Sequence, residues 1–411
     1  MNYDKKILIL GAGEGQIPLI QRSKEAGWCT IGVSPKGDYP GFELADEIAY
    51  CNIADIDAVV ELAKTLQVQA IATDQTDIPV MAIQRVAKEM GVPAIHCEDI
   101  NNFRYKSRMR ELCQSAGIKT IPYLVTNDIL DVESFFHTQA GSVIIKPVDS
   151  QGSRGVTQVK TIAELRDAFD KAMSYSKQKK VIVEQFIEGQ EVEVDTVMYR
   201  DEIKAVLIGD VFNFESIQIF SAYERIYPSQ LPTATQDEIR RVNAQTLKVL
   251  GLHTGWTHGE YMVATNGDVY LLEVGARGGG NYIGSDIVKT MIGVSSDEMA
   301  FRTAIGDESF YNEVGLTNKC CAYKCFCLPE GTISAINIDE AWLHSDIVLR
   351  HNLEGLHVGK VCHRTTDKTT RFTVIVVADN HQQLRKLMDD IPNHISIEVT
   401  SAEGKKGCIW I

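Results

Sequence analysis

The first hundred residues alternate between short apolar runs and longer stretches with helical periodicity. The apolar runs are typical of buried strands in a parallel sheet. The stretches between them place apolar residues three and four positions apart, as helices lying on such a sheet do. We therefore expect an α/β unit with a parallel sheet. Its predicted strands are residues 6–11, 29–34, 70–74 and 93–96, and its predicted helices include residues 17–27 and 58–66.

A second pattern begins near Lys106. Residues 106–117 have helical periodicity, and residues 228–250 open with proline and threonine before continuing as a helix. From about residue 311 the chain is rich in apparent strands, with one helix expected near residues 380–388. We therefore expect three units, with bounds 1–105, 106–310 and 311–411.

Composition narrows the classes of function. The 411 residues carry a formal net charge of −14 and no long basic block, which disfavours non-specific binding to nucleic acid. No apolar stretch approaches the roughly 18 residues of a membrane span. The first apolar run is short and ends in glycines, unlike a secretory signal. We expect a cytoplasmic protein with neither nucleic acid nor membrane as a partner.

Ten cysteines are present, and four of them, Cys320, Cys321, Cys325 and Cys327, lie close together. In a cytoplasmic protein they are expected to be free thiols. Their C-C-x3-C-x-C spacing matches no common zinc site. Cys321, Tyr323, Cys325 and Cys327 would instead share one face of a strand, so we favour buried core thiols over a metal site.

The loop of residues 11–15, GAGEG, follows the first predicted strand. It resembles a dinucleotide-binding fingerprint, but its spacing is G-x-G-x-G and not G-x-G-x-x-G. The second strand is followed by Ser34, Pro35 and Lys36, where a ribose-binding acid would be expected. Three interpretations stay open: an NAD site, a tight strand-to-helix turn, or a helix N-terminus that receives a substrate carboxylate.

Lys146 stands at the end of a predicted strand and precedes the loop DSQGSRG at residues 149–155. Glycines and small hydroxyl residues let backbone N–H groups close around phosphate oxygens, and the lysine adds positive charge. The alternative is an exposed turn with a solvated lysine. The spacing of a Walker loop is absent.

Acidic residues alternate along the next predicted hairpin. The strand of residues 181–187 turns at Glu188 and Gly189 and returns with Glu191, Glu193 and Asp195 on one face. A strand interrupted by a glycine turn can offer backbone groups to an adenine edge, with Glu184 and Glu191 near the adenine amine or the ribose hydroxyls. The alternative is an edge strand with a charged outer face.

A hairpin is predicted around the Asn-Gly pair at residues 266–267. Counting outward from a two-residue turn pairs Thr265 with Asp268 and Glu260 with Glu273. Two carboxylates directly opposite each other, with Cβ atoms about 5 Å apart, repel unless a proton or cation lies between them. Such a pair suits Mg²⁺ with nucleotide phosphates. A shared-proton pair or an exposed pair without function is the alternative.

Arg277 follows Glu273 by four residues and precedes three glycines, Gly278 to Gly280. Its guanidinium suits a phosphoryl group in transfer or a substrate carboxylate held by two hydrogen bonds. The glycines allow the backbone to approach a ligand closely.

Taken together and in this order, these features resemble the ATP-grasp superfamily, and the resemblance covers essentially the whole chain. They are Lys106, Lys146, the glycine-rich loop, the E-x-F-I-x-G-x-E motif of residues 184–191, and the hairpin with Glu260, Glu273 and Arg277. The chain is similar in style to formate-dependent glycinamide ribonucleotide transformylase, biotin carboxylase, carbamoyl-phosphate synthetase and L-amino acid ligase. The resemblance implies an α/β fold with a Rossmann-like N-terminal domain, an ATP-grasp domain whose small mobile lid spans about residues 120–190, and a mixed α+β C-terminal domain.

The resemblance also implies an ADP-forming carboxylate–amine ligase that uses ATP with Mg²⁺ or Mn²⁺, acts on small molecules through an acyl phosphate, and is often a dimer. Lys146 and Arg277 would be catalytic, and Glu260 and Glu273 would hold the metal. The nucleotide would be bound by Lys106, Lys146, Ser150, Gly152, Ser153, Gly155, Glu184, Gln185, Phe186, Ile187 and Glu191. The substrate would lie near Gly13, Glu14, Asp74, Asp77, Arg277, Gly279 and Asn281.

One residue departs from the resemblance. Many members of this superfamily carry a metal-binding asparagine two residues after the second glutamate, where this chain has Gly275. Water could take that place, or the second metal could be held less fully. Gly275 therefore keeps a catalytically silent nucleotide-binding module as an alternative function, and the N-terminal glycine loop keeps an NAD-dependent oxidoreductase as another. The oxidoreductase leaves Lys146 and the glutamate pair unexplained.

Overall fold

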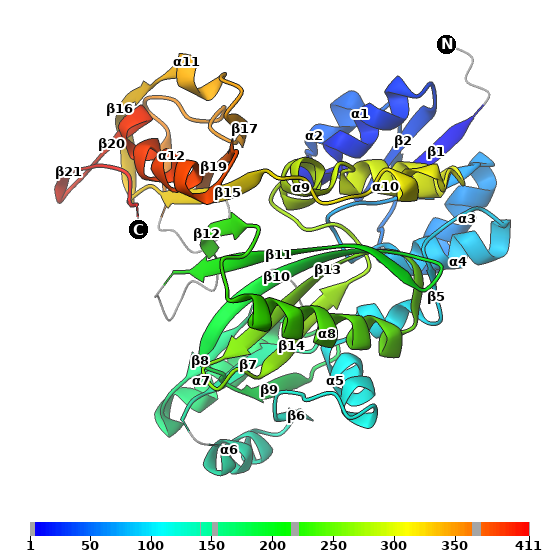
Figure 1. The fold of residues 1–411 in the computed structure, drawn as a ribbon, viewed down its shortest axis with the longest axis horizontal. Coiled ribbons are helices and arrows are strands. Elements are labelled where there is room, and N and C mark those ends of the chain that lie inside the picture. Colours follow the sequence, from blue (N-terminus) through cyan, green and yellow to red (C-terminus); the bar gives the residue numbers. More distant parts are fainter. Residues whose placement is uncertain (1–4, 140, 150–154, 215–221, 364–370, 411) are drawn as a thin grey trace.

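The computed structural model describes residues 5–139, 141–149, 155–214, 222–363 and 371–410. Its ribbon shows the N-terminal unit and the C-terminal unit on the same side of a long central sheet, with a smaller sheet at the opposite end (Figure 1). Among the described residues, no helix is both long and apolar enough to cross a bilayer.

The N-terminal unit is the expected parallel α/β sheet, with strand order β3-β2-β1-β4. Cys29–Ser34 is buried along its whole length, which explains why its sequence, CTIGVS, contains only apolar or small residues. Its strands are β1 (Lys6–Leu10), β2 (Cys29–Ser34), β3 (Glu47–Tyr50) and β4 (Ala70–Ala72), and its helices are α1 (Ile17–Glu25), α2 (Pro40–Leu44), α3 (Ile56–Leu66) and α4 (Val80–Met90).

The strand predicted at residues 93–96 differs from the prediction. Only His96–Cys97 forms a strand, β5, and it is partly exposed. It pairs antiparallel with a strand of the central sheet, through Leu252 opposite Cys97 and Thr254 opposite His96. The sequence of a short apolar segment does not determine which sheet the segment joins. Pro93 has no backbone N–H to donate, which disfavours the residues before β5 as part of a parallel sheet.

A small antiparallel sheet with order β6-β9-β7-β8 forms the region where a lid was expected. Helix α7 begins with a capping box, in which Thr161 and Glu164 satisfy each other's backbone N–H groups. The elements are β6 (Tyr123–Thr126), α6 (Ile129–Thr138), β7 (Val143–Pro147), β8 (Thr157–Val159), α7 (Ile162–Tyr175) and β9 (Val181–Gln185).

The central nine-stranded sheet runs β14-β13-β10-β11-β12-β15-β19-β17, and β5 joins it at β13. Three of its strands, β15, β17 and β19, come from beyond residue 310, so the last hundred residues extend this sheet. Its strands are β10 (Gly189–Tyr199), β11 (Glu202–Asn213), β12 (Ala222–Tyr227), β13 (Leu252–Ala264), β14 (Val269–Gly275), β15 (Cys320–Cys327), β17 (Val348–His351) and β19 (Arg371–Ala378).

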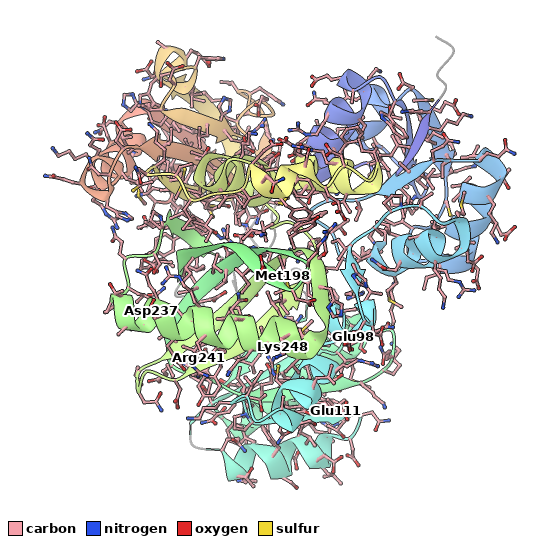
Figure 2. The ribbon with its side chains drawn as sticks, turned by 45° about the vertical axis from the view of Figure 1, so that its right-hand side comes forward. Glu98, Glu111, Met198, Asp237, Arg241 and Lys248 are labelled. Atoms are coloured by element: carbon pink, nitrogen blue, oxygen red, sulfur yellow. The ribbon has the colours of Figure 1, made fainter. Side chains whose placement is uncertain are left out.

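Helices α5 (Lys106–Ser115) and α8 (Thr233–Leu250) pack beside this sheet. Helix α8 buries Ile239, Val242 and Leu247, while Asp237, Arg241 and Lys248 lie along its solvent face (Figure 2). This division is the helical periodicity that its sequence predicts.

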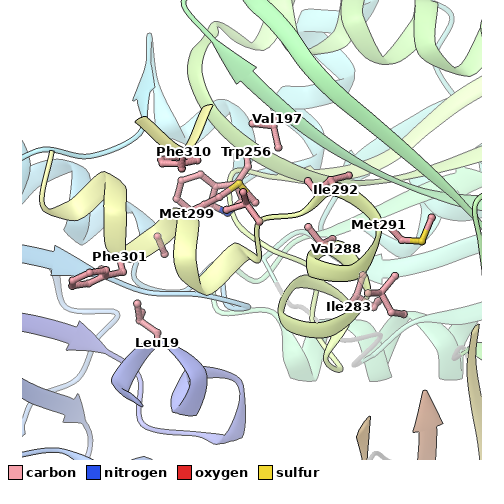
Figure 3. Close-up of a cluster of buried hydrophobic side chains, with 14 of the residues drawn as sticks. Leu19, Val197, Trp256, Ile283, Val288, Met291, Ile292, Met299, Phe301 and Phe310 are labelled. Carbon is pink, nitrogen blue, oxygen red and sulfur yellow. The ribbon is translucent and has the colours of Figure 1, made fainter. Parts of the chain in front are cut away.

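A buried cluster joins the N-terminal unit to the central sheet. Leu19 of α1 packs with Met299 and Phe301 of α10 (Ser296–Ala304), and these continue to Val197 and Trp256 on the sheet (Figure 3). Helix α9 (Val288–Ile292) completes the layer. The shared core fixes the loops after β1 and β4 relative to the sheet.

The remaining C-terminal elements form a second small sheet, with order β18-β16-β20-β21. The predicted helix near residues 380–388 is present and extends further, to His394, with the Asn380 side chain accepting a hydrogen bond from Gln383 N. The elements are β16 (Gly331–Ile338), α11 (Glu340–Leu343), β18 (Val361–Cys362), α12 (His381–His394), β20 (Ile395–Ser401) and β21 (Gly404–Lys406).

Candidate active site

The hairpin of β13 and β14 places Glu260 directly opposite Glu273, as predicted. The route to that pairing differs from the prediction. Ala264, and not Thr265, bonds Asp268 across the turn, with a 2.8 Å hydrogen bond from Ala264 N to Asp268 O. The turn therefore has three residues and ends at Gly267, whose φ of 87° is left-handed.

The three-residue turn shifts the pairing register of β13 and β14 by one residue, and a bulge further along the hairpin reverses that shift. Tyr261 pairs with Leu271 and Glu260 pairs with Glu273, so Leu272 is an extra residue on β14. A β-bulge of this kind frees a backbone carbonyl and redirects the residues that follow it. The Leu272 carbonyl accepts a 2.7 Å hydrogen bond from Arg110 Nη2.

The two opposed carboxylates are kept in different charge states. Lys106 at the start of α5 forms an ion pair with Glu273. Burial opposes ionisation of Glu273, but the Lys106 ammonium outweighs it and lowers the pKa of Glu273 to about 2. Burial and the neighbouring Glu273 and Glu191 carboxylates raise the pKa of Glu260 to about 8. The repulsion expected from the sequence is thus relieved by a cation on one side and a proton on the other.

Glu260→Gln is therefore expected to stabilise the metal-free protein at neutral and higher pH. A raised pKa means that the folded state holds a proton that the unfolded chain releases above about pH 4.5, so wild-type stability falls as pH rises from about 4.5 to 8. The glutamine variant lacks this loss. Unfolding in EDTA at pH 5 and pH 8 should show a gain that grows with pH and exceeds about 1 kcal/mol at pH 8.

Glu111→Gln, on the exposed face of α5, provides the control and should show no such pH-dependent gain (Figure 2). Glu273→Gln is expected to behave in the opposite way and to lose stability, because it removes the partner of Lys106. A Glu260→Gln variant that is destabilised in EDTA at pH 8 would show that the carboxylate is ionised and structurally paired.

Glu184 is the centre of a second buried charge cluster. Arg110 Nε donates to Glu184 Oε1 at 2.9 Å, and Lys146 Nζ forms an ion pair with Glu184 Oε2. Burial opposes ionisation of Glu184, but these cations lower its pKa to about 2. The carboxylate faces Lys146 and Arg110, and its contact with the adenine amine or the ribose hydroxyls stays a prediction.

Arg110 was not predicted as a site residue. It lies one helical turn after Lys106, and its side chain is 1% exposed. It connects α5 to Glu184 of the lid sheet and to the bulge in β14. The four-residue spacing of Lys106 and Arg110 was a sequence signal for one shared helix face.

Two of the acids of β10, Glu193 and Asp195, are buried, and Glu191 is partly exposed. Strand β10 pairs with β11 on one side and β13 on the other, so it is a central strand, and the edge-strand alternative is wrong. Glu193 accepts a 2.8 Å hydrogen bond from Arg225 Nε and another from Tyr227. Glu191, predicted as a ribose ligand, accepts a 2.6 Å hydrogen bond from Asn213 Nδ2. Burial and the nearby Glu193 raise the pKa of Glu191.

His258, two residues before Glu260, is a further buried group that the sequence did not single out. Its Nδ1 lies 2.9 Å from Asp195 Oδ1. Burial opposes protonation, but the Asp195 carboxylate raises the pKa of His258 to about 9. The ligand atoms of Glu193, His258 and Glu260 lie within 4.8 Å of one another. Asp195 already contacts His258 and Arg225 already contacts Glu193, so these residues form a buried charge network.

Arg277 faces the N-terminal unit. Its Nε and Nη2 donate to the two carboxylate oxygens of Asp77 at 2.8 and 3.0 Å, and its Nη1 donates to Gly278 O at 2.9 Å. Asp74 is completely buried, and Ser296 Oγ donates to it at 2.6 Å. Burial raises the pKa of Asp74 to about 7. The predicted substrate residues Asp74, Asp77 and Arg277 therefore meet at one boundary between units.

The side chain of Gln16 packs against the N-terminal glycine loop. Gln16 Oε1 accepts a hydrogen bond from Gly13 N at 3.1 Å, and Gln16 Nε2 donates to Asp74 O at 2.6 Å. A Cβ atom on Gly11 would lie 2.8 Å from Gln16 Oε1. This packing around Gly11 supports the interpretation as a tight strand-to-helix turn.

The other predicted site residues belong to several elements. Ser150, Gly152 and Ser153 lie outside the described residues. Gly155 is described, with a φ of 76°. Glu14 Oε2 accepts a 3.3 Å hydrogen bond from Tyr282, next to Asn281. Gly279 packs against His258, since a Cβ atom on it would lie 2.9 Å from His258 Nδ1. Gln185 ends β9, where Phe186 N donates to Ser142 O at 2.9 Å before the chain continues through Ile187.

The cysteine cluster forms strand β15, which is buried along its whole length. Cys321, Tyr323 and Cys325 belong to one core cluster, as their alternation predicts, while Cys320 and Phe326 on the opposite face belong to another. The prediction of core thiols agrees with this burial. Whether purified protein contains zinc stays a prediction, and we expect no stoichiometric zinc by elemental analysis.

Comparison with known proteins gives the class. Residues 140–286 match the ATP-grasp domain family. An L-amino acid ligase from Bacillus licheniformis superposes with a TM-score of 0.80 at 18% identity, covering 98% of this chain and 100% of the other. A phosphoribosylglycinamide synthetase from Anaerococcus prevotii gives a TM-score of 0.75 at 23% identity, covering 96% and 99%. Residues 140–286 are thus similar to an ATP-grasp domain, and the chain shares the fold of these solved structures.

Part of the chain is also similar in sequence to D-alanine–D-alanine ligases. A D-alanine–D-alanine ligase from Trichlorobacter lovleyi is 34% identical over 135 residues, which are 32% of this chain and 42% of the relative. A second, from Geobacter sulfurreducens, is 27% identical over 167 residues, which are 40% and 52%. This chain spans about half the length of the curated relatives that it matches.

Proposed function

We propose that this protein is an ATP- and magnesium-dependent ligase that phosphorylates a small carboxylate and joins the resulting acyl group to an amine. The observation that carries the proposal is the pairing of Glu260 with Glu273 beside Lys106. The named ligases among its relatives and structural neighbours support the same reaction class. Manganese is an alternative to magnesium at the same carboxylates.

The residues fit a magnesium ion. Glu260 and Glu273 provide two carboxylates on one face of the hairpin, and Mg²⁺ prefers such oxygen ligands together with phosphate. When bound, the metal would neutralise charge on the nucleotide phosphates. The raised pKa of Glu260 means that metal binding would release a proton there.

The side chains around this pair would act by position and charge. The γ-phosphoryl group passes from ATP to a carboxylate oxygen, with ADP as the leaving group, and the amine nitrogen then attacks the acyl carbon and releases phosphate. Lys106, Lys146 and Arg277 would offset the negative charge that gathers on the phosphoryl oxygens. The lid sheet would exclude water that otherwise hydrolyses the acyl phosphate.

A hydroxylamine-trapping assay tests the reaction class even though the natural amine substrate is not identified. Hydroxylamine, a small strong nucleophile, should trap an activated acyl group as a hydroxamate while ADP is released. Because named relatives join amino acids, D-alanine and the L-amino acids come first in the screen, followed by hydroxy acids, formate and bicarbonate. ADP release that depends on no carboxylate and gives no hydroxamate would leave an ATPase. Nucleotide binding without turnover would favour the silent module.

Lys146→Ala is expected to weaken ATP binding about tenfold, which corresponds to about 1.4 kcal/mol, while the protein stays folded. Lys146 lies at the end of β7, and Glu184 keeps Arg110 as a partner after the change. Calorimetric titration with ATP and magnesium measures the effect, with Lys171→Ala on the exposed face of α7 as the control. An unchanged affinity in a folded Lys146→Ala variant would remove this lysine from the phosphate site.

A further inference from the structure

Gly275 stands at a point where the structure has no room for a side chain. It is two residues after Glu273 on β14, so a side chain there would project from the same face as Glu273. A Cβ atom on Gly275 would lie 2.6 Å from Asp77 Oδ1 and 3.2 Å from Arg277 Nε. Its φ is not left-handed, so the backbone conformation does not require glycine. The space is taken by a carboxylate from the N-terminal unit.

The carboxylate in this space is held by two hydrogen bonds. Arg277 Nε and Nη2 each donate to one Asp77 oxygen, and the two side chains are only 14% and 13% exposed. A bidentate pair of this kind fixes the plane of the guanidinium as well as its position. The third contact, from Arg277 Nη1 to Gly278 O, leaves the side chain little freedom to turn.

Asp77 reaches this place because the N-terminal unit is firmly attached to the sheet. Asp74, three residues earlier, accepts a hydrogen bond from Ser296 of α10. Arg22 of α1 donates to Asp297 of the same helix at 2.7 Å. The apolar cluster around Met299 continues this contact (Figure 3). The loop that carries Asp77 is therefore anchored on a packed boundary and not on a free surface.

We propose that Asp77 takes the place of a side chain at residue 275. The N-terminal unit, and not strand β14, supplies the oxygen atoms that hold Arg277 beside the Glu260/Glu273 pair, and Gly275 is glycine because any side chain would displace them. Asp77 is thus a positioning residue that acts through Arg277. The space that a side chain at residue 275 would fill is thus occupied by a carboxylate from another part of the chain.

The proposal predicts a specific dependence between two substitutions. Gly275→Ala should push Asp77 away from Arg277 and lower the melting temperature in EDTA by several degrees, and Asp77→Ala should do the same by removing the pair. The double variant should melt no lower than Asp77→Ala alone, because the alanine methyl group then meets no carboxylate. Gly315→Ala, where a Cβ atom would meet nothing within 4 Å, is the matched control.

A second pair of substitutions tests whether an acceptor oxygen beside Arg277 is sufficient to position its side chain. Asp77→Ala with Gly275→Asn brings a side-chain oxygen from the strand instead of from the loop, starting from a Cβ position 3.2 Å from Arg277 Nε. Hydroxamate-coupled turnover should recover at least about tenfold over Asp77→Ala, mainly in kcat and not in the KM for ATP, since Arg277 meets the transferring group. Asp77→Asn, which keeps one acceptor oxygen, should fall between wild type and Asp77→Ala.

Two results would overturn the proposal. Additive losses of melting temperature for Gly275→Ala and Asp77→Ala would mean that the residues act independently, and an Asp77→Ala variant equal to wild type in melting and turnover would mean that the pair positions nothing. The turnover measurement rests on the proposed ligase function. The melting measurement does not, so additivity refutes the proposal even if the ligase reaction is confirmed, and non-additivity supports it even if no turnover is found.

Discussion

Replacing Arg277 by alanine is expected to lower hydroxamate formation by about two to three orders of magnitude, the usual loss when one preorganised donor to a transition-state charge is removed. Arg277 contacts both Gly278 and Asp77, and it lies four residues beyond Glu273, just after β14 ends. Charge on the transferring phosphoryl group would lose a fixed guanidinium that water cannot replace in a partly closed site.

The same change should also cost stability, so the two effects must be separated. Asp77 would lose the bidentate partner that compensates its burial, and breaking such a pair typically costs about 3–5 kcal/mol. Arg277→Lys keeps the positive charge but not the planar fork, and it should recover stability more than turnover. Arg240→Ala on α8, whose side chain is 40% exposed, is the control for loss of an arginine as such.

Melting temperature and hydroxamate formation are measured on the same preparations. A folded Arg277→Ala variant with turnover within about threefold of wild type would remove Arg277 from the reaction and leave it a role in joining the two units. A loss of turnover that Arg277→Lys fully restores would show that charge alone is needed, and that the geometry held by Asp77 is not.

Much of this site was predictable because its residues are close in sequence to recognisable elements. Glu260 and Glu273 lie on one hairpin, so an Asn-Gly turn and alternating apolar residues bring them together. The predicted count from the turn was nevertheless wrong by one residue. The bulge at Leu272 corrected it, and a bulge depends on a partner for the freed carbonyl, which here is Arg110 on a distant helix.

The residues that the sequence did not reveal are buried charges whose partners come from elsewhere in the chain. Arg225 on β12 bonds Glu193 on β10, and His258 on β13 bonds Asp195 on β10. Alternating acids in a sequence are most often a solvated face, but here Glu193 and Asp195 are buried, and β10 is a central strand because it pairs on both sides. Strand order is set by tertiary packing, so local pattern alone could not decide between an edge and a centre.

Arg110→Leu is expected to destabilise the protein by about 3–5 kcal/mol, the usual cost of removing one member of a buried charge pair. The leucine fills part of the space but leaves Glu184 with Lys146 as its remaining ion-pair partner. It also leaves the Leu272 carbonyl without its 2.7 Å hydrogen bond. Because that carbonyl belongs to the bulge that sets Glu273 opposite Glu260, metal-dependent binding of nucleotide should weaken as well.

Denaturant unfolding at several pH values identifies the cause. The lowered pKa of Glu184 contributes stability above about pH 4.5 that is lost as the pH falls toward 2. The gap between wild type and Arg110→Leu should therefore be widest near neutral pH and shrink below about pH 4.5. Arg108→Leu, two residues earlier on the same helix with a side chain 45% exposed, is the matched control and should change stability by less than about 1 kcal/mol. A gap that stays constant down to pH 3 would show that packing around Arg110, and not the charge of Glu184, accounts for the loss.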